Sequence, residues 1–260
     1  MPGVTIVPGL YLDVFLWLGK GEMEKNLIQD LSFLSSNEYW GRGILIGNLK
    51  GKVYIGYFIM GRSQNSRNRY FYEDGENLAI APYDVDKLED PSLIIYYPIK
   101  TSGDKLIVTN GDQTDTIEEG FREGKTFQES LRTRCFEPDE PNYTPRISGL
   151  VSMKTGDFSM SILKNQDGKG ELCARYLYEY GCQEGNGRFI HTYEKNDNPL
   201  PTFCGEPWSI DLSGAGDLET FGNTIWNCLD DENKISLCVM SIDKETGDRT
   251  TIIKNKRMGD

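Results

Sequence analysis

The sequence predicts an antiparallel α+β protein in which helices pack outside β-sheets. Four pairs of β-branched and aromatic runs are each joined by a short turn rich in Gly, Asp or Asn, which is typical of β-hairpins. Helical patterns are few and fall between the hairpins instead of alternating with single strands. Many strand positions are apolar on both faces, which indicates sheets that are covered on both sides.

The expected elements follow one another along the chain. The hairpins join 43–47 to 52–60, 92–99 to 105–110, 146–153 to 158–164, and 235–242 to 250–255. Two capping-box patterns, which start at Thr116 and Thr126, predict short helices near 116–133. In 216–229 apolar residues recur at helical spacing behind Asp217, the expected N-cap.

The 260 residues are interpreted as a single domain over 23–260, preceded by an extension over 1–22. That extension has no basic start and contains Asp13, so a signal peptide is not expected, and it is too short and interrupted to span a bilayer. The segment "FEPDEPNYTP" (136–145) holds three prolines and is interpreted as a loop within the domain.

Charge and composition exclude several classes of function. A formal net charge of −12 argues against nonspecific binding to nucleic acid or to an anionic membrane. His191 is the only histidine and none of the six cysteines forms a C-x-x-C pair, so no metal site is expected. "SGAGD" (213–217) lacks the third glycine of a dinucleotide fingerprint, because Glu219 stands there, and no cofactor is expected.

The segment "GRSQNSRNRY" (61–70) gathers three arginines directly after an apolar run. A solvated charged loop is one interpretation. The other is a phosphate site, because guanidinium groups bind phosphate bidentately and neighbouring hydroxyl and amide groups can complete the cradle. The sequence alone leaves both open.

Several motifs together resemble the archaeal-type IMP cyclohydrolase family. They are "YWGRGILIG", "GRSQNSRNRY", "LIVTNGDQTDTI", "NYTPRISG" and the "PLPTFCGEP" region, and they occur in that order after about Glu38. The resemblance implies an N-terminal-nucleophile-hydrolase-like αββα sandwich of two antiparallel sheets flanked by helices. Pro2 or Glu24 would follow the two candidate initiator methionines, so the amidases' terminal nucleophile is not expected here.

The resemblance also implies roles for particular residues. The expected catalytic residues are Arg62 as oxyanion stabiliser, Tyr96 as proton relay and Glu140 as general acid/base, with Tyr97 and Asp139 as rivals for the last two roles. The expected substrate-binding residues are Ser63, Arg67, Arg69, Asn110, Asp115 and Arg146. Arg67 is the favoured phosphate ligand among them.

The implied reaction is the dehydrative closure of 5-formamidoimidazole-4-carboxamide ribotide to IMP, in the cytoplasm and without a cofactor. The expected partner is therefore a purine-precursor ribonucleotide, and a homo-oligomer is left open. Two alternatives remain at this point. One is a noncatalytic purine-nucleotide-binding protein, and the other is an amide hydrolase of the same fold.

Overall fold

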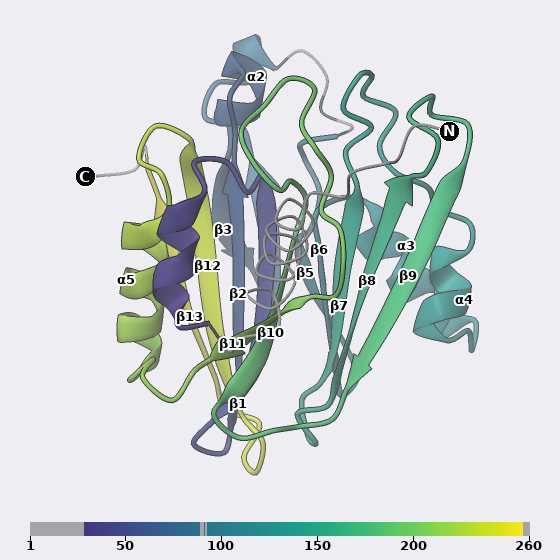
Figure 1. The fold of residues 1–260 in the computed structure, drawn as a ribbon. Coiled ribbons are helices and arrows are strands. Elements are labelled where there is room, and N and C mark those ends of the chain that lie inside the picture. Colours follow the sequence, from purple (N-terminus) through teal and green to yellow (C-terminus); the bar gives the residue numbers. More distant parts are fainter. Residues whose placement is uncertain (1–28, 89–90, 92, 257–260) are drawn as a thin grey trace, which may run out of the picture.

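The computed structural model describes residues 29–88, 91 and 93–256, and its strands form two antiparallel sheets (Figure 1). The expected extension over 1–22 lies outside the described residues. The strands of the first sheet, in spatial order, are β11 (Trp208–Asp211), β10 (Asn186–His191), β1 (Arg42–Leu49), β2 (Lys52–Met60), β12 (Lys234–Asp243) and β13 (Arg249–Asn255).

The second sheet has seven strands and lies against the first. Its spatial order is β3 (Tyr70–Asp74), β4 (Asn77–Ala81), β5 (Ile99–Ser102), β6 (Lys105–Thr109), β7 (Arg146–Ser152), β8 (Phe158–Asn165) and β9 (Cys173–Tyr180). Side chains from both sheets interdigitate in a common core, in which Ile44 and Ile46 of β1 lie with Ile147 and Val151 of β7. The sandwich follows from strands that are apolar on both faces.

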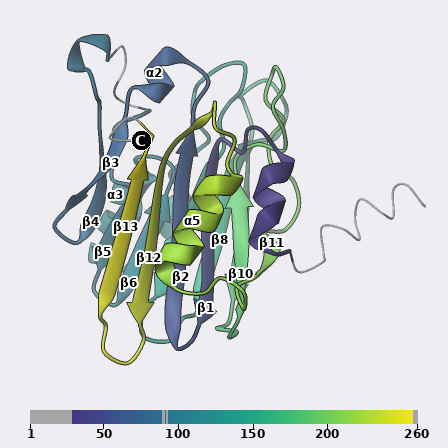
Figure 2. The ribbon, with the colours of Figure 1, turned by 90° about the vertical axis from the view of Figure 1, so that its left-hand side faces the viewer.

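Helices cover the outer faces of both sheets. In Figure 2, α5 (Leu218–Cys228) lies across the first sheet, and a core cluster joins it to the 3₁₀ helix η1 (Leu31–Ser36). The helices α3 (Gln113–Arg122) and α4 (Phe127–Leu131) pack on the second sheet through Ile117 and Leu131. A short helix α2 (Gln64–Arg67) and a 3₁₀ turn η2 (Val85–Lys87) complete the elements.

Three of the four predicted hairpins are confirmed in both strands. The tightest turn joins β1 to β2 at Lys50 and Gly51, whose φ angles are 51° and 76°, and this is the two-residue geometry that the right-handed twist of a hairpin favours. The helix predicted over 216–229 is also confirmed, with Asp217 accepting a hydrogen bond from the Thr220 amide at 2.8 Å.

Two expectations are wrong in detail. Of the strand expected over 92–99, residue 92 lies outside the described residues, 93–98 form an irregular segment that ends at Pro98, and β5 begins only at Ile99, with the hairpin turn at Gly103. Thr116 does not cap a helix: α3 already begins at Gln113, so Thr116 lies in its interior. Within the described residues, no helix is long and apolar enough to cross a membrane.

Candidate active site

A cavity of about 360 Å³ lies at the end of the sandwich that carries α2, the upper end in Figure 1. Loops that are far apart in the sequence meet there. Its lining consists of Tyr39, Arg42, Arg62, Ser63, Asn65, Ser66, Leu93, Ile94, Glu137, Asp139, Asn142, Thr144, Tyr193 and Leu200. This cavity brings acidic, basic and hydroxyl side chains together, and it is the candidate active site.

The arginine loop reaches the cavity through a tight turn after β2. A Cβ on Gly61 would lie 2.4 Å from Ser66 Oγ, so only glycine allows this approach. Ser63 caps α2, and its Oγ accepts a hydrogen bond from the Ser66 amide at 3.1 Å. The exposed Arg62 guanidinium lies 5.1 Å from the centre of the Tyr39 ring and donates to the Asp197 carbonyl at 2.9 Å.

The loop over 136–145 supplies the acidic groups. Its backbone is held by a hydrogen bond from the Glu137 amide to the Thr144 carbonyl, at 2.8 Å. Asp139 Oδ1 accepts from the Thr144 amide at 2.6 Å, and the Thr144 hydroxyl bonds both Asp139 Oδ2 and the Tyr193 hydroxyl. The Tyr193 ring stacks on Tyr39 at 5.9 Å between ring centres.

Glu137 is the most perturbed acid of this group. Its side chain is 2% exposed, and burial raises its pKa to about 7, even though the charges of Arg42 and Arg146 oppose the rise. The described residues offer no hydrogen-bond partner to its Oε1. A buried carboxyl with a pKa near neutrality, lining an open cavity, is suited to donate and accept a proton.

Arg42 provides the opposite charge. It stands at the start of β1, is buried, and lines the same cavity. Burial alone would lower the pKa of its guanidinium, but the charge of Glu137 and the surrounding tyrosines raise it overall, so Arg42 stays cationic. Among the described residues, its Nε has no hydrogen-bond partner.

Arg69 and Tyr96 are buried next to this group without lining the cavity. The Tyr96 hydroxyl lies 2.8 Å from the Tyr57 hydroxyl, and burial raises the pKa of Tyr57 well above its usual value. Arg69 donates through Nε to the Ser66 carbonyl at 2.9 Å, while the described residues leave its two terminal nitrogens unpaired. Burial and the nearby charge of Arg42 both lower the pKa of Arg69.

Asn110 and Arg146 do not line the cavity, but they hold the segments next to it. Asn110 joins the end of β6 to β7: its amide group donates to the Pro145 carbonyl at 2.9 Å and accepts from the Ile147 amide at 2.8 Å. Arg146 pairs with Asp112 at 2.7 Å. A Cβ on Gly111 would lie 2.4 Å from an Arg146 nitrogen, so glycine at that position permits this packing.

Of the other predicted residues, four lie elsewhere or at the margin. Glu140 is exposed and does not line the cavity, whereas its rival Asp139 does.

Asp115 is exposed and pairs with Lys100 at 2.6 Å. Tyr97 donates to Asp74 at 2.7 Å, and Arg67 lines a separate cavity.

Sequence reasoning missed Arg42 and Glu137. Arg42 lies within the motif "YWGRGILIG". The pattern that could have indicated a functional residue there is a single charged side chain directly before an apolar run. Glu137 is one of three acids in a four-residue stretch, and spacing alone does not tell which of them is buried.

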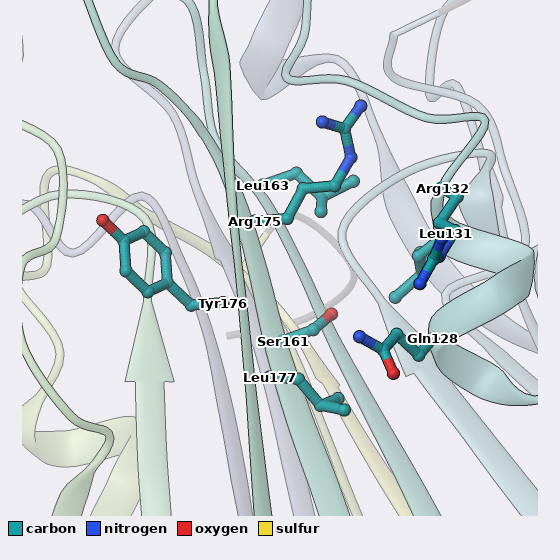
Figure 3. A pocket seen from close by; sticks show the side chains of 8 residues that line it. All are labelled: Gln128, Leu131, Arg132, Ser161, Leu163, Arg175, Tyr176 and Leu177. Atoms are coloured by element: carbon teal, nitrogen blue, oxygen red, sulfur yellow. The ribbon is translucent and has the colours of Figure 1, made fainter.

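A larger cavity, of about 500 Å³, lies between α4 and the outer face of β8 and β9 (Figure 3). It is lined by Gln128, Leu131, Arg132, Ser161, Leu163, Arg175, Tyr176 and Leu177. None of these eight residues is acidic, and the Tyr176 ring points away from the others in Figure 3. The lining of this second cavity therefore has no carboxyl group to match Glu137 and Asp139 of the first.

Comparisons with known proteins agree with the resemblance noted in the sequence. The model of the family described as IMP cyclohydrolase-like protein matches residues 39–247. Curated IMP cyclohydrolases from several archaea also match, among them the three that follow.

The chain is 36% identical to the Methanosphaera stadtmanae enzyme over 61% of this chain and 75% of that relative. It is 28% identical to the Methanocaldococcus jannaschii enzyme over 80% of this chain and 95% of that relative. For the Methanocella arvoryzae enzyme, 36% identity covers 44% of this chain and 58% of the relative. The chain therefore belongs to the IMP cyclohydrolase-like protein family.

Proposed function

We propose that this chain is an IMP cyclohydrolase, which closes the ring of 5-formamidoimidazole-4-carboxamide ribotide to give IMP and water, in the cytoplasm. The observation that carries the proposal is the buried Glu137, with a pKa of about 7, beside the cationic Arg42 in a cavity of nucleotide-accommodating size. Family membership supports the same reaction. Family membership and the two antiparallel sheets with helices outside them also support assigning the chain to the N-terminal-nucleophile-hydrolase-like αββα fold.

The cavity offers different chemistry at its two ends. Arg62 and Ser63 are exposed and suit the substrate's phosphate, whereas Arg42, Glu137, Thr144 and Tyr193 are buried and suit the base. Since both reacting groups are carried on one imidazole ring, the site has mainly to hold them in the reactive rotamer.

Ring closure moves two protons. The carboxamide nitrogen attacks the formyl carbon and loses a proton, while the formyl oxygen gains negative charge and takes up a proton. The resulting carbinolamine then loses its hydroxyl as water, and the former formamido nitrogen gives up its hydrogen to leave the C=N bond.

Glu137 accepts the proton from the carboxamide nitrogen when it is ionised and returns a proton to the oxygen when it is neutral. A pKa of about 7 makes both forms available at physiological pH. Arg42 stabilises the charge on oxygen, by ~3 kcal/mol if it acts like a typical oxyanion-hole donor.

The roles assigned from sequence to Arg62 and Tyr96 stay predictions beside these, whereas Glu137 takes the place of the exposed Glu140 as the proposed general acid/base. Arg69 adds buried positive charge to the same group, and Asn110 and Arg146 hold the loops that carry it.

The test is an ultraviolet absorbance assay of the purified chain with the formylated ribotide. Ring closure at a rate proportional to enzyme concentration is expected, together with at least a hundredfold loss in the Glu137→Gln variant. Binding of the ribotide without any acceleration of ring closure would contradict the proposal and favour a noncatalytic nucleotide-binding protein.

A further inference from the structure

A small cavity of about 180 Å³ lies on the other side of the arginine loop from the candidate active site. Its lining residues are Arg67, Tyr83, Glu232, Lys234, Ile235 and Lys256, none of which lines the active-site cavity. The arginine loop contributes to the walls of both cavities, because Ser66 lines the active-site cavity and Arg67 lines the small one.

The Arg67 guanidinium is fixed in this cavity by hydrogen bonds that use only some of its N–H groups. Its Nε donates to the Gly61 carbonyl at 2.8 Å, and one terminal nitrogen lies 3.4 Å from Asn233 Oδ1. The Gly61 amide in turn donates to the Asn233 carbonyl at 2.9 Å, which fixes the loop against the segment before β12. A guanidinium has five N–H groups, so three remain for a ligand.

Lys234 and Lys256 bring two more cations to the same cavity. The Lys234 side chain is only 9% exposed, and its Nζ donates to the Trp226 carbonyl at 3.0 Å and pairs with Asp231 at 2.5 Å. Lys256 Nζ donates to the Asp231 carbonyl. Each ammonium group carries three N–H donors, so these contacts leave donors on both lysines.

The charge of the cavity is opposite to that of the chain. Three lining cations face two carboxylates, Glu232 in the lining and Asp231 paired with Lys234, so the local charge is positive in a protein of net charge −12. The surrounding negative field disfavours anions in general, so this local reversal selects a small, highly charged anion that can contact several donors at once. A phosphate group has that charge, and the guanidinium fork matches its oxygens.

We propose that Arg67, Lys234 and Lys256 form a phosphate-binding site that is distinct from the base-binding part of the active site. Two sources carry this chemistry: free inorganic phosphate, and the phosphate of a ribonucleotide whose base lies in the active-site cavity. The first would make the site an effector site next to the loop of Arg62. The second rests on the proposed function and would place the nucleotide's phosphate at Arg67, in place of Arg62 and Ser63.

The test measures binding of inorganic phosphate by isothermal titration calorimetry. Arg67→Gln and Lys256→Gln are each expected to weaken binding at least tenfold, and both positions are partly exposed, so folding is preserved. Lys87→Gln is the matched control, because Lys87 is an exposed cation that pairs with Asp84 and does not line the cavity. The proposed site is contradicted if the original chain does not bind phosphate. It is also contradicted if Arg67→Gln binds phosphate as tightly as the original chain does.

A second arm identifies the source of the phosphate. The titration is repeated with saturating IMP. Undiminished phosphate binding assigns the site to free phosphate, whereas competition, combined with weaker IMP binding in Arg67→Gln, assigns it to the nucleotide's own phosphate. Neither arm uses the cyclisation rate, so the site can fail while the proposed function stands, and the reverse.

Discussion

At the scale of single residues, Glu137 is the side chain whose chemistry depends most on its surroundings. It has the ordinary pKa of a glutamate in the unfolded chain, and only burial behind the 136–145 loop raises that pKa to about 7. Replacing it by Gln preserves the shape and removes the proton exchange. We expect kcat to fall by roughly 10²–10⁴-fold, in the usual range for loss of a general acid or base.

Glu140→Gln is the matched control for this prediction. Glu140 lies three residues away, is exposed, and is the acid that the sequence favours. We expect its replacement to leave kcat within a few-fold of the original value. A large loss in Glu140→Gln with normal activity in Glu137→Gln would return the catalytic role to Glu140.

The same carboxyl predicts a pH dependence of stability. Below pH 4.5 Glu137 is protonated in both folded and unfolded chains, but between 4.5 and about 7 only the folded chain keeps the proton. The unfolding free energy contributed by this group therefore falls as pH rises, by up to ~3 kcal/mol for a shift of this size. In urea denaturation, Glu137→Gln should gain stability relative to the original chain between pH 5 and pH 8. A constant difference over that range would show that the pKa is not raised.

At the scale of elements, the α4 capping box is a local signal that the fold uses directly. The Thr126 side chain accepts a hydrogen bond from the Glu129 amide at 3.2 Å, and the Glu129 carboxylate accepts from the Thr126 amide at 2.8 Å. Thr126→Ala should lower the free energy of unfolding by about 1 kcal/mol in urea denaturation. Thr116→Ala is the control, because Thr116 lies inside α3, where Ala is the better helix former. Equal losses in both variants would contradict the assignment of the caps.

Elements were predictable from the sequence where the signal was local. The hairpin turns and the Asp217 cap depend on a few adjacent residues, and they are confirmed. The box at Thr116 failed because α3 starts earlier, at Gln113, whose side-chain amide donates to the Ile147 carbonyl of β7 at 3.2 Å. That contact depends on tertiary packing, which no short pattern contains.

The site was predictable to the level of its loops but not of its side chains. The arginine loop and the 136–145 loop both reach the cavity, as the sequence favoured. Which acid is buried depends on where the loop lies relative to Arg42 of the other sheet, whose charge acts on Glu137 although the two residues are almost a hundred positions apart. The roles implied by the resemblance therefore pointed to Glu140, while the fold buries Glu137.

At the scale of the whole molecule, the site depends on how closely the two sheets approach. Arg42 comes from the first sheet, whereas Glu137 lies in a loop that leads into β7 of the second. Directly between the sheets, Gly149 of β7 faces β1. A Cβ on Gly149 would lie 2.6 Å from Ile46 Cδ1 and 3.5 Å from Ile44 Cγ2. The absence of a side chain at this position sets the local separation of the sheets.

Gly149→Ala should therefore act on both stability and catalysis. The added methyl has to push Ile46 aside in a core without spare volume, which typically costs about 1–3 kcal/mol in unfolding free energy. Because the displacement moves β7 relative to β1, kcat should fall more than a loss of stability alone explains, in protein that is still fully folded at the assay temperature. Gly181→Ala is the control, since its nearest neighbour would be Asp157 Oδ1 at 3.9 Å, and its effect should stay within about 1 kcal/mol. If Gly149→Ala matched Gly181→Ala in urea denaturation and in kcat, the spacing of the sheets would not control the site.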